Sequence, residues 1–231
     1  LLEPGAGLAA RQQALLDGLG GAAAAVPRRW LQGLPEPFDG VVFANEVVDA
    51  LPCERFVMQQ GAAWRLGVGR VRIAPGGAYG IAPGGAYGIA PGGAYGDAFE
   101  WRARPADGAC PGDDGFTRAM AARLADLAAA GVVLPDGCCG EFHPALDDWL
   151  AALAGRLRRG LLLFFDYGLP RAGLLRPERL HGTLRAYFRH RAPDDPFLWP
   201  GLCDLTAWVD FTALAGAGAA AGLEQEPGLR G

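Results

Sequence analysis

Acidic side chains follow three short apolar segments of the sequence. Glu3 ends the first segment, Glu46 closely follows residues 40–44, and Asp166 follows residues 161–165. A carboxylate accepts hydrogen bonds at both oxygens, so it can bind a pair of hydroxyl groups or hold a planar guanidinium in a forked geometry. These three residues are therefore candidates for binding a hydroxyl-bearing or cationic ligand.

Three further polar residues could also bind a ligand, and each of them has an alternative explanation that involves no ligand. Asn45 offers a donor and an acceptor, which suits an amino group of a ligand, but its side chain can equally hold the turn after the strand. Asp49 lies three residues after Glu46, so one helical turn would place both on one face, although a cap or a salt bridge also explains Asp49. Glu141 is either a ligand-binding carboxylate or a surface acid.

The elements that must position these residues are predicted by apolar patterning. Residues 40–44 and 161–165 are continuous apolar runs, typical of parallel strands covered on both faces, and residues 1–3 read as the end of another buried strand. Helices are expected over residues 8–19, 116–130, 144–158 and 211–221, and antiparallel strands over residues 55–60 and 63–73.

This order predicts an α/β fold with a mostly parallel sheet, helices on both faces and an antiparallel excursion. In such sheets, ligands bind beyond the carboxyl ends of the strands, which is where the acids lie.

Helix boundaries are indicated by individual residues. Pro144 suits a first turn, and the arginines at 156, 158 and 159 favour a helix that continues to Gly160, because cations stabilise the carboxyl end of a helix. Asp210 can cap the last helix, which Gly222 then ends.

An octapeptide, Ile-Ala-Pro-Gly-Gly-Ala-Tyr-Gly, occurs three times in succession over residues 73–96. Units so short and so rich in glycine and proline cannot bury a face against one another, which favours an insertion in an exposed loop. The alternative is a lid that stacks Tyr79, Tyr87 and Tyr95 on a substrate. Otherwise residues 1–231 are expected to form a single, partial domain.

Composition excludes several classes of protein. The net charge is -4 with no dense block of Lys and Arg, which disfavours a nucleic-acid surface. The basic run from His181 to Arg191 could touch phosphate, but a solvated or substrate-facing segment is favoured. The five cysteines show no CxxC spacing, so free thiols and no metal site are expected. No apolar stretch is long enough to span a bilayer, and a cytoplasmic protein is expected.

Three segments together resemble the MidA-like methyltransferases. They are Asn45-Glu46-Val47-Val48-Asp49-Ala50-Leu51-Pro52 within residues 38–56, Phe165-Asp166-Tyr167-Gly168-Leu169-Pro170, and the series from Gly182-Thr183-Leu184 through Arg189-His190-Arg191 to Asp204-Leu205-Thr206-Ala207-Trp208-Val209-Asp210-Phe211. Glu3 with Arg11-Gln12 also resembles a short stretch after the second strand of that family.

The resemblance implies a class I, Rossmann-like enzyme that uses S-adenosylmethionine to methylate an arginine of another protein. Mitochondrial members are linked to complex I assembly, so a mitochondrial location is expected if the source is eukaryotic. The implied catalytic residues are Glu46, Asp49 and Asp166, and the cofactor-binding residues are Glu3, for the ribose hydroxyls, and Asn45. The implied substrate-binding residues are Glu141, His190 and Asp204. For His190, an exposed side chain without a role in binding is the alternative interpretation.

The sequence departs from the family pattern at several positions. Cys203 stands where a Gln is usual and Pro193 where a His is usual, and the glycine-rich cofactor turn is expected upstream of Leu1. A second hypothesis is therefore a scaffold or assembly factor that keeps the fold without turnover. A nicotinamide-dependent Rossmann enzyme is disfavoured, because the sequence has no GxGxxG.

Overall fold

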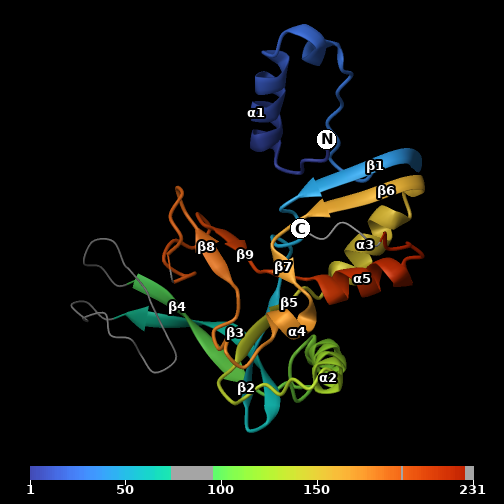
Figure 1. Ribbon diagram of the computed structural model, residues 1–231. Coiled ribbons are helices and arrows are strands. Elements are labelled where there is room, and N and C mark those ends of the chain that lie inside the picture. Colours follow the sequence, from blue (N-terminus) through green and yellow to red (C-terminus); the bar gives the residue numbers. More distant parts are fainter. Residues whose placement is uncertain (74–95, 194, 227–231) are drawn as a thin grey trace.

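The computed structural model describes residues 1–73, 96–193 and 195–226 (Figure 1). It opens with α1 (Ala6–Asp17) and the 3-10 helix η1 (Gly21–Ala25). The prediction of a buried strand at residues 1–3 is wrong. Leu2 forms only an isolated parallel bridge with Leu31, and the exposed fractions of Leu1 and Leu2 are 51% and 49%. Apolar residue type alone does not bury a segment for which no neighbouring layer is present.

The two predicted parallel strands are confirmed. β1 (Phe38–Asn45) pairs in parallel with β6 (Leu157–Phe165), with Val41 opposite Leu161. The helices α3 (Leu146–Ala154) and α5 (Phe211–Ala220) lie together beside this pair (Figure 1). A core cluster joins the loop after β1 to the two helices and is made of Val48, Leu146, Leu150, Val209 and Ala217, and Leu162 and Phe164 of β6 pack against it.

Burial on both faces of these strands, in contrast, is not observed. Side chains alternate along β1, so that the residues of one face are half-buried and those of the other face are exposed. Val41 is 61% exposed and Phe43 63%, and the Phe43 ring contacts that of Phe165 at 5.3 Å between centroids. Helices on both faces of the strands were therefore wrongly predicted for the described residues.

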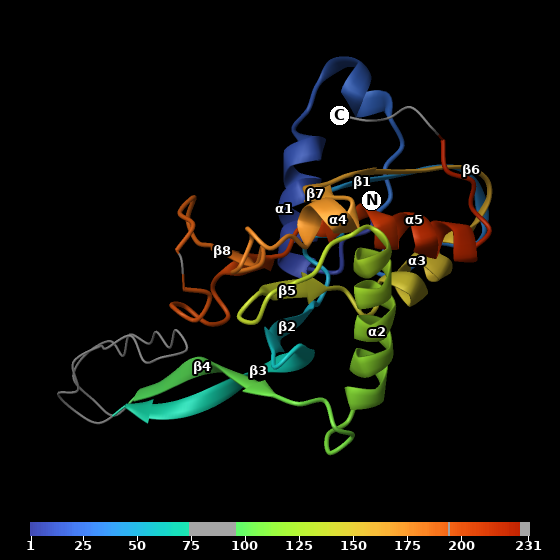
Figure 2. The same cartoon turned by 60° about the horizontal axis from the view of Figure 1, so that its bottom comes forward.

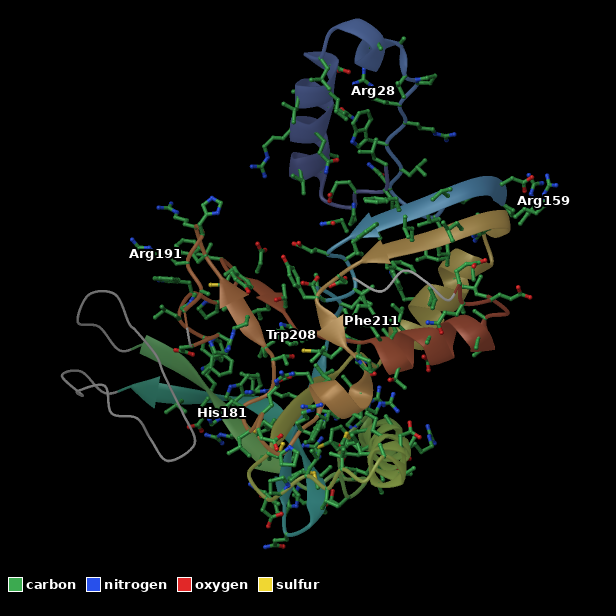
Figure 3. The ribbon with its side chains drawn as sticks, in the orientation of Figure 1. Arg28, Arg159, His181, Arg191, Trp208 and Phe211 are labelled. Atoms are coloured by element: carbon green, nitrogen blue, oxygen red, sulfur yellow. The ribbon has the colours of Figure 1, made fainter. Side chains whose placement is uncertain are left out.

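The predicted carboxyl end of the third helix is also wrong. Helix α3 ends at Gly155, and the following residues enter β6. Arg158 and Arg159 do not cap a helix but pair with Asp39 of β1, at 3.2 and 2.6 Å, at the end of the strand pair where Figure 3 labels Arg159. The pairing of the two strands, which the local sequence does not encode, extends the strand backward to Leu157.

The antiparallel excursion is confirmed and is larger than predicted. Four strands are ordered β4 (Gly96–Arg104), β3 (Ala62–Ile73), β2 (Glu54–Gln59) and β5 (Cys139–Phe142). Helix α2 (Asp113–Ala129) contributes Phe116, Met120 and Leu127 to the cluster that it shares with Phe56 and Phe142. Ile73 pairs with Gly96, and the repeat between them lies outside the described residues, together with the proposed tyrosine lid.

Short elements complete the fold. They are β7 (Gly168–Leu169), α4 (Arg171–Leu174), β8 (Arg185–Tyr187), β9 (Asp204–Thr206) and β10 (Val209–Asp210). Among the named strands of the described residues, only β1 with β6 and β7 with β10 pair in parallel, so these strands are not mostly parallel. The predicted cap is confirmed, since Asp210 Oδ1 accepts a hydrogen bond from Ala213 N at 3.0 Å. In both Figure 1 and Figure 2, the segment between β8 and β9 projects from the body of the molecule.

Candidate functional site

The turn after β1 is held by the acid that follows β6. Glu46 continues the strand pairing by donating its backbone N–H to the Phe165 carbonyl at 2.7 Å, and it turns the chain with a φ of 50°. Asp166 Oδ2 then accepts hydrogen bonds from three consecutive backbone amides: Val47 (3.2 Å), Val48 (2.9 Å) and Asp49 (3.3 Å). Asp166 thus positions the loop that carries the other two predicted catalytic acids.

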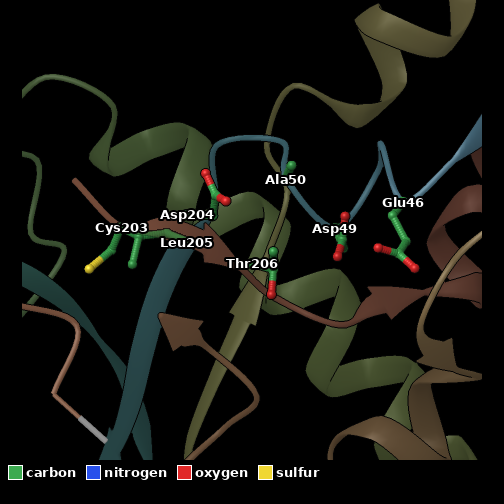
Figure 4. Close-up of a pocket in the computed structure, with 7 residues that line it drawn as sticks. All are labelled: Glu46, Asp49, Ala50, Cys203, Asp204, Leu205 and Thr206. Carbon is green, nitrogen blue, oxygen red and sulfur yellow. The ribbon is translucent and has the colours of Figure 1, made fainter. Parts of the chain in front are cut away.

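A pocket of about 460 Å³ opens next to this loop. Figure 4 shows its lining, in which Glu46, Asp49 and Asp204 present three carboxylates from two distant parts of the chain. The remaining lining residues are Ala50, Cys203, Leu205 and Thr206. The structure therefore brings together a predicted catalytic pair and one predicted substrate-binding residue.

The pocket carries an excess of negative charge. The pKa of Asp49 is raised from its ordinary value of 3.8 to about 6, first by burial and then by the charges of Asp166 and Glu46. Asp49 is only 6% exposed. Within the described part of the chain, no ion pair is formed by Glu46, Asp49 or Asp204. Like charges held together in a partly buried site favour a cationic guest, because the guest lowers their mutual repulsion.

Strand β9 forms the opposite wall of the pocket. The backbone N–H of Ala207, which follows β9, donates to the carbonyl of Asp49 at 2.9 Å, and Trp208 N donates to Thr183 Oγ1 at 3.0 Å. Ala207 is 1% exposed. These buried contacts fix the wall against the loop after β1.

Glu141 lies outside the pocket lining and is saturated by the protein itself. Its Oε1 accepts from Arg55 Nε at 2.9 Å, and its Oε2 accepts from the Thr183 backbone N–H at 2.7 Å and from the Thr183 hydroxyl at 3.2 Å. At 6% exposed, this carboxylate joins β5 to the segment before β8. The geometry gives Glu141 a positioning role, and its contact with a substrate stays a prediction.

Glu3 lies outside the pocket lining, and both oxygens of its carboxylate accept hydrogen bonds from the protein. Its Oε1 accepts from Gly5 N at 2.8 Å and its Oε2 from Gln12 Nε2 at 3.4 Å. Gln12 is in turn held by Trp30, whose Nε1 donates to Gln12 Oε1 at 3.1 Å. The carboxylate is half-buried and each oxygen keeps a second lone pair, and its binding of ribose hydroxyls stays a prediction.

Two other predicted residues are exposed and lie outside the pocket lining. Asn45 ends β1 opposite Phe165, next to Glu46. His190 stands at the tip of the segment between β8 and β9, with a φ of 62°. The roles of both residues stay predictions.

Cys203, Leu205 and Thr206 of the pocket wall carry no sequence signal that marks them as site residues. Strand β9 has only three residues, which is too short for a periodic pattern, although the segment was part of the quoted resemblance. His143, which follows β5, is buried at 6% exposed. Burial lowers the pKa of His143, and its Nε2 has no hydrogen-bond partner within the described residues.

Neither a metal cluster nor a membrane span emerges from the ranges 1–73, 96–193 and 195–226. No group of three or more His, Cys, Asp or Glu side chains there is arranged so that it could hold a metal ion. Every helix in those ranges is too short or too polar to cross a bilayer.

The architecture is that of a mixed α/β protein whose two parallel strands end at an acidic pocket. Residues 1–227 match the model of a family described as "Putative S-adenosyl-L-methionine-dependent methyltransferase". The chain belongs to this family. This finding confirms that the chain belongs to a methyltransferase family and that the family's cofactor is S-adenosylmethionine, and it does not distinguish the MidA-like group.

Two solved structures from Burkholderia thailandensis are similar to this chain. One, a COG1565 superfamily member described as a "likely methyl transferase" and bound to S-adenosyl-homocysteine, is 34% identical over 96% of the chain, with a TM-score of 0.70. The other, an uncharacterized protein of the same superfamily, is 33% identical over 96% of the chain, also with a TM-score of 0.70. The chain spans about half of each, 47% and 49% of their lengths. No protein with a curated description matches.

Proposed function

We propose that residues 1–231 form part of a class I, MidA-like methyltransferase domain that transfers a methyl group from S-adenosylmethionine to an arginine side chain of a protein. The observation that carries this proposal is the pocket in which Glu46, Asp49 and Asp204 lie without a cationic partner among the described residues. A guanidinium supplies the missing positive charge and five donors in a planar fork.

In this proposal the carboxylates bind the guanidinium and also prepare it for methyl transfer. A guanidinium is always protonated at neutral pH, and its lone pairs are delocalised. Glu46 and Asp49, paired to two of its nitrogens, would localise the charge and orient the third nitrogen. Asp166 acts through the loop that it holds, and Asp204 binds the guanidinium from the opposite wall.

Glu3 is the residue that fits the cofactor best, because its oriented carboxylate accepts hydrogen bonds from vicinal hydroxyls. Asn45, at the end of β1, can donate to or accept from the same ligand. The bound cofactor supplies a sulfonium-activated methyl group, and the protein must hold the acceptor nitrogen in line with it. The relative bound to S-adenosyl-homocysteine supports this reading.

Transfer is tested with the full-length protein, methyl-labelled S-adenosylmethionine and an arginine-containing peptide. The expected product is methylarginine, identified after acid hydrolysis, and Glu46→Gln is expected to lower the rate by about 100-fold or more because it removes an orienting charge. Glu178→Gln is the matched control, since Glu178 is exposed and outside the pocket lining. Label on another residue type, or equal rates for Glu46→Gln and the native protein, contradicts the proposal.

Calorimetry distinguishes the scaffold hypothesis from the proposed enzyme. A scaffold of the same fold without turnover would release no heat with S-adenosylmethionine or S-adenosyl-homocysteine in calorimetry. An active enzyme would bind both, and Glu3→Gln would weaken binding by roughly tenfold, since it removes the charge that strengthens hydrogen bonds to the hydroxyls.

A further inference from the structure

We propose that the arm formed by β8, β9 and the residues between them docks an acidic segment of the protein substrate beside the arginine that enters the pocket. This inference rests on the proposed function and names a feature of the substrate that the pocket alone does not specify. It assigns the binding of that segment to Arg185, Arg189, His190 and Arg191.

The arm carries a concentration of exposed basic side chains. Arg185 lies on β8, and Arg189, His190 and Arg191 follow at its tip, all of them exposed. In the described ranges, none of the three arginines forms an ion pair with an acid. Figure 3 shows Arg191 on the projecting segment, away from the body of the molecule. The charges are therefore available to a partner.

The tip is a tight turn in an unfavourable conformation. Phe188 and Arg191 exchange backbone hydrogen bonds at 2.8 and 3.0 Å, which closes a two-residue turn. Its central residues, Arg189 and His190, have φ values of 48° and 62°. Two-residue turns with both central residues at positive φ favour Asn and Gly. Two large basic residues there carry a backbone cost, which favours a role for their side chains over a role in folding.

The base of the arm is anchored by buried residues, and at its tip the Arg189 guanidinium lies over the Phe188 ring, 5.3 Å from the ring centroid. Ala186 on β8 is 1% exposed. Beyond the tip, Trp199 packs on the Phe188 ring at 4.6 Å between centroids, and Phe197 packs on Trp101 of β4 at 4.8 Å. The arm therefore presents its charges from a fixed position relative to the pocket.

The register of the two strands sets the spacing between basic tip and acidic pocket. Tyr187 lies opposite Asp204, and Arg185 lies opposite Thr206, and both partners on β9 line the pocket. Phe188 follows Tyr187 by one residue, and Arg191 lies opposite Phe188 because the chain reverses at Arg189 and His190. The basic residues of the turn therefore lie within about two strand residues, or about 7 Å, of the level of Asp204. Allowing for the length of the side chains, we expect an Asp or Glu about two to three residues from the methylated arginine.

The charge pattern favours a protein over a nucleic acid as the partner. A polyphosphate chain following the arm would meet the carboxylates of Glu46, Asp49 and Asp204 at its base, and like charges repel. A peptide can match both regions, with a cation in the pocket and anions on the arm. Such complementarity supplies specificity and register.

The test measures the preference for acidic over neutral peptides. Two fluorescent peptides of equal length carry one arginine and differ only in having Asp or Asn about three residues from it. Binding to the full-length protein is followed by anisotropy, and methylation by transfer of label. The acidic peptide is expected to bind more tightly, and the variant R189Q/R191Q is expected to reduce that preference roughly five- to tenfold. R158Q/R159Q, which removes two exposed arginines at the amino end of β6, is the matched control and should leave the preference unchanged.

The outcomes separate this inference from the proposed function. Methylation of both peptides at equal efficiency, with no effect of R189Q/R191Q on their ratio, would overturn the docking role and leave the methyltransferase intact. Arm-dependent binding of the acidic peptide without methylation would support docking and reject the proposed chemistry. Arm-dependent binding of a single-stranded RNA, with no preference between the peptides, would overturn the inference in favour of a nucleic-acid surface.

Discussion

The carboxylate of Asp166 accepts a hydrogen bond from the backbone amide of Asp49 at 3.3 Å, across 117 residues of sequence. The same carboxylate raises the pKa of the Asp49 side chain through its charge. One residue therefore both holds the loop after β1 and adds to the negative charge of the pocket that the loop lines. The pairing of β1 with β6 makes this possible, because it brings the carboxyl ends of the two strands to one edge.

Replacing Asp166 with alanine should loosen this loop. The backbone amides of Val47, Val48 and Asp49 would lose their shared acceptor, and an unpaired amide costs about 1–3 kcal/mol when it stays dry. We expect the free energy of unfolding, measured with urea, to fall by about 2 kcal/mol. Asp17→Ala is the control, because Asp17 is exposed at the end of α1. Equal stability of the two variants would argue against a holding role for Asp166.

Stability should depend on pH through Asp49. Since its pKa is raised from 3.8 to about 6, the folded protein holds the proton more tightly than the unfolded chain. This contribution is fully present below about pH 3.8 and is lost as the pH rises through about 6. Asp49→Asn should therefore flatten the fall in stability over that interval and raise the unfolding free energy at neutral pH by about 1–2 kcal/mol. Parallel pH profiles for the variant and the native protein would rule out this linkage.

The buried ion pair between Arg171 and Asp210 should be far more important than the exposed pairs of Asp39. Arg171 Nε donates to Asp210 Oδ2 at 2.7 Å, and the two residues are 8% and 5% exposed. Asp210→Asn keeps an acceptor for the cap of α5 and leaves Arg171 paired only with the more exposed Asp126, so a loss at the lower end of the range for a broken buried pair, about 3 kcal/mol, is expected. Asp39→Asn should cost less than about 1 kcal/mol. Chemical denaturation of both variants checks the contrast, and similar losses would contradict it.

Glycine at position 160 should be required by the approach of β6 to β1. A Cβ there would lie 1.7 Å from the Gly40 carbonyl oxygen, at a φ of 149° that side chains rarely adopt. Gly160→Ala should cost at least about 3 kcal/mol, measured by thermal unfolding. Gly216→Ala in α5 meets nothing within 4 Å and should instead stabilise the protein by about 0.5–1 kcal/mol. A tolerated Gly160→Ala would contradict the close approach.

Several elements were predictable because their signals are local. The runs at residues 40–44 and 161–165 became β1 and β6, and the helix predicted over residues 116–130 is α2. The acidic residues after the parallel strands could be placed at one edge without coordinates, since parallel strands share the direction of their carboxyl ends. Asp210 was recognisable as a cap because its role depends only on the residues that follow it.

The sequence alone thus determined that residues 40–44 and 161–165 would form parallel strands and that Glu46 and Asp166 would stand at their ends, whereas the buried strand expected before Glu3 is not observed. The tertiary structure decided that Asp204 joins Glu46 and Asp49, that Glu141 is occupied by Arg55 and Thr183, and that α3 stops short of its arginines. The reason is physical. Residue type and spacing indicate how a side chain is placed on its own helix or strand. Which distant residues it contacts depends on strand register and on packing, and these are fixed only when the whole chain folds.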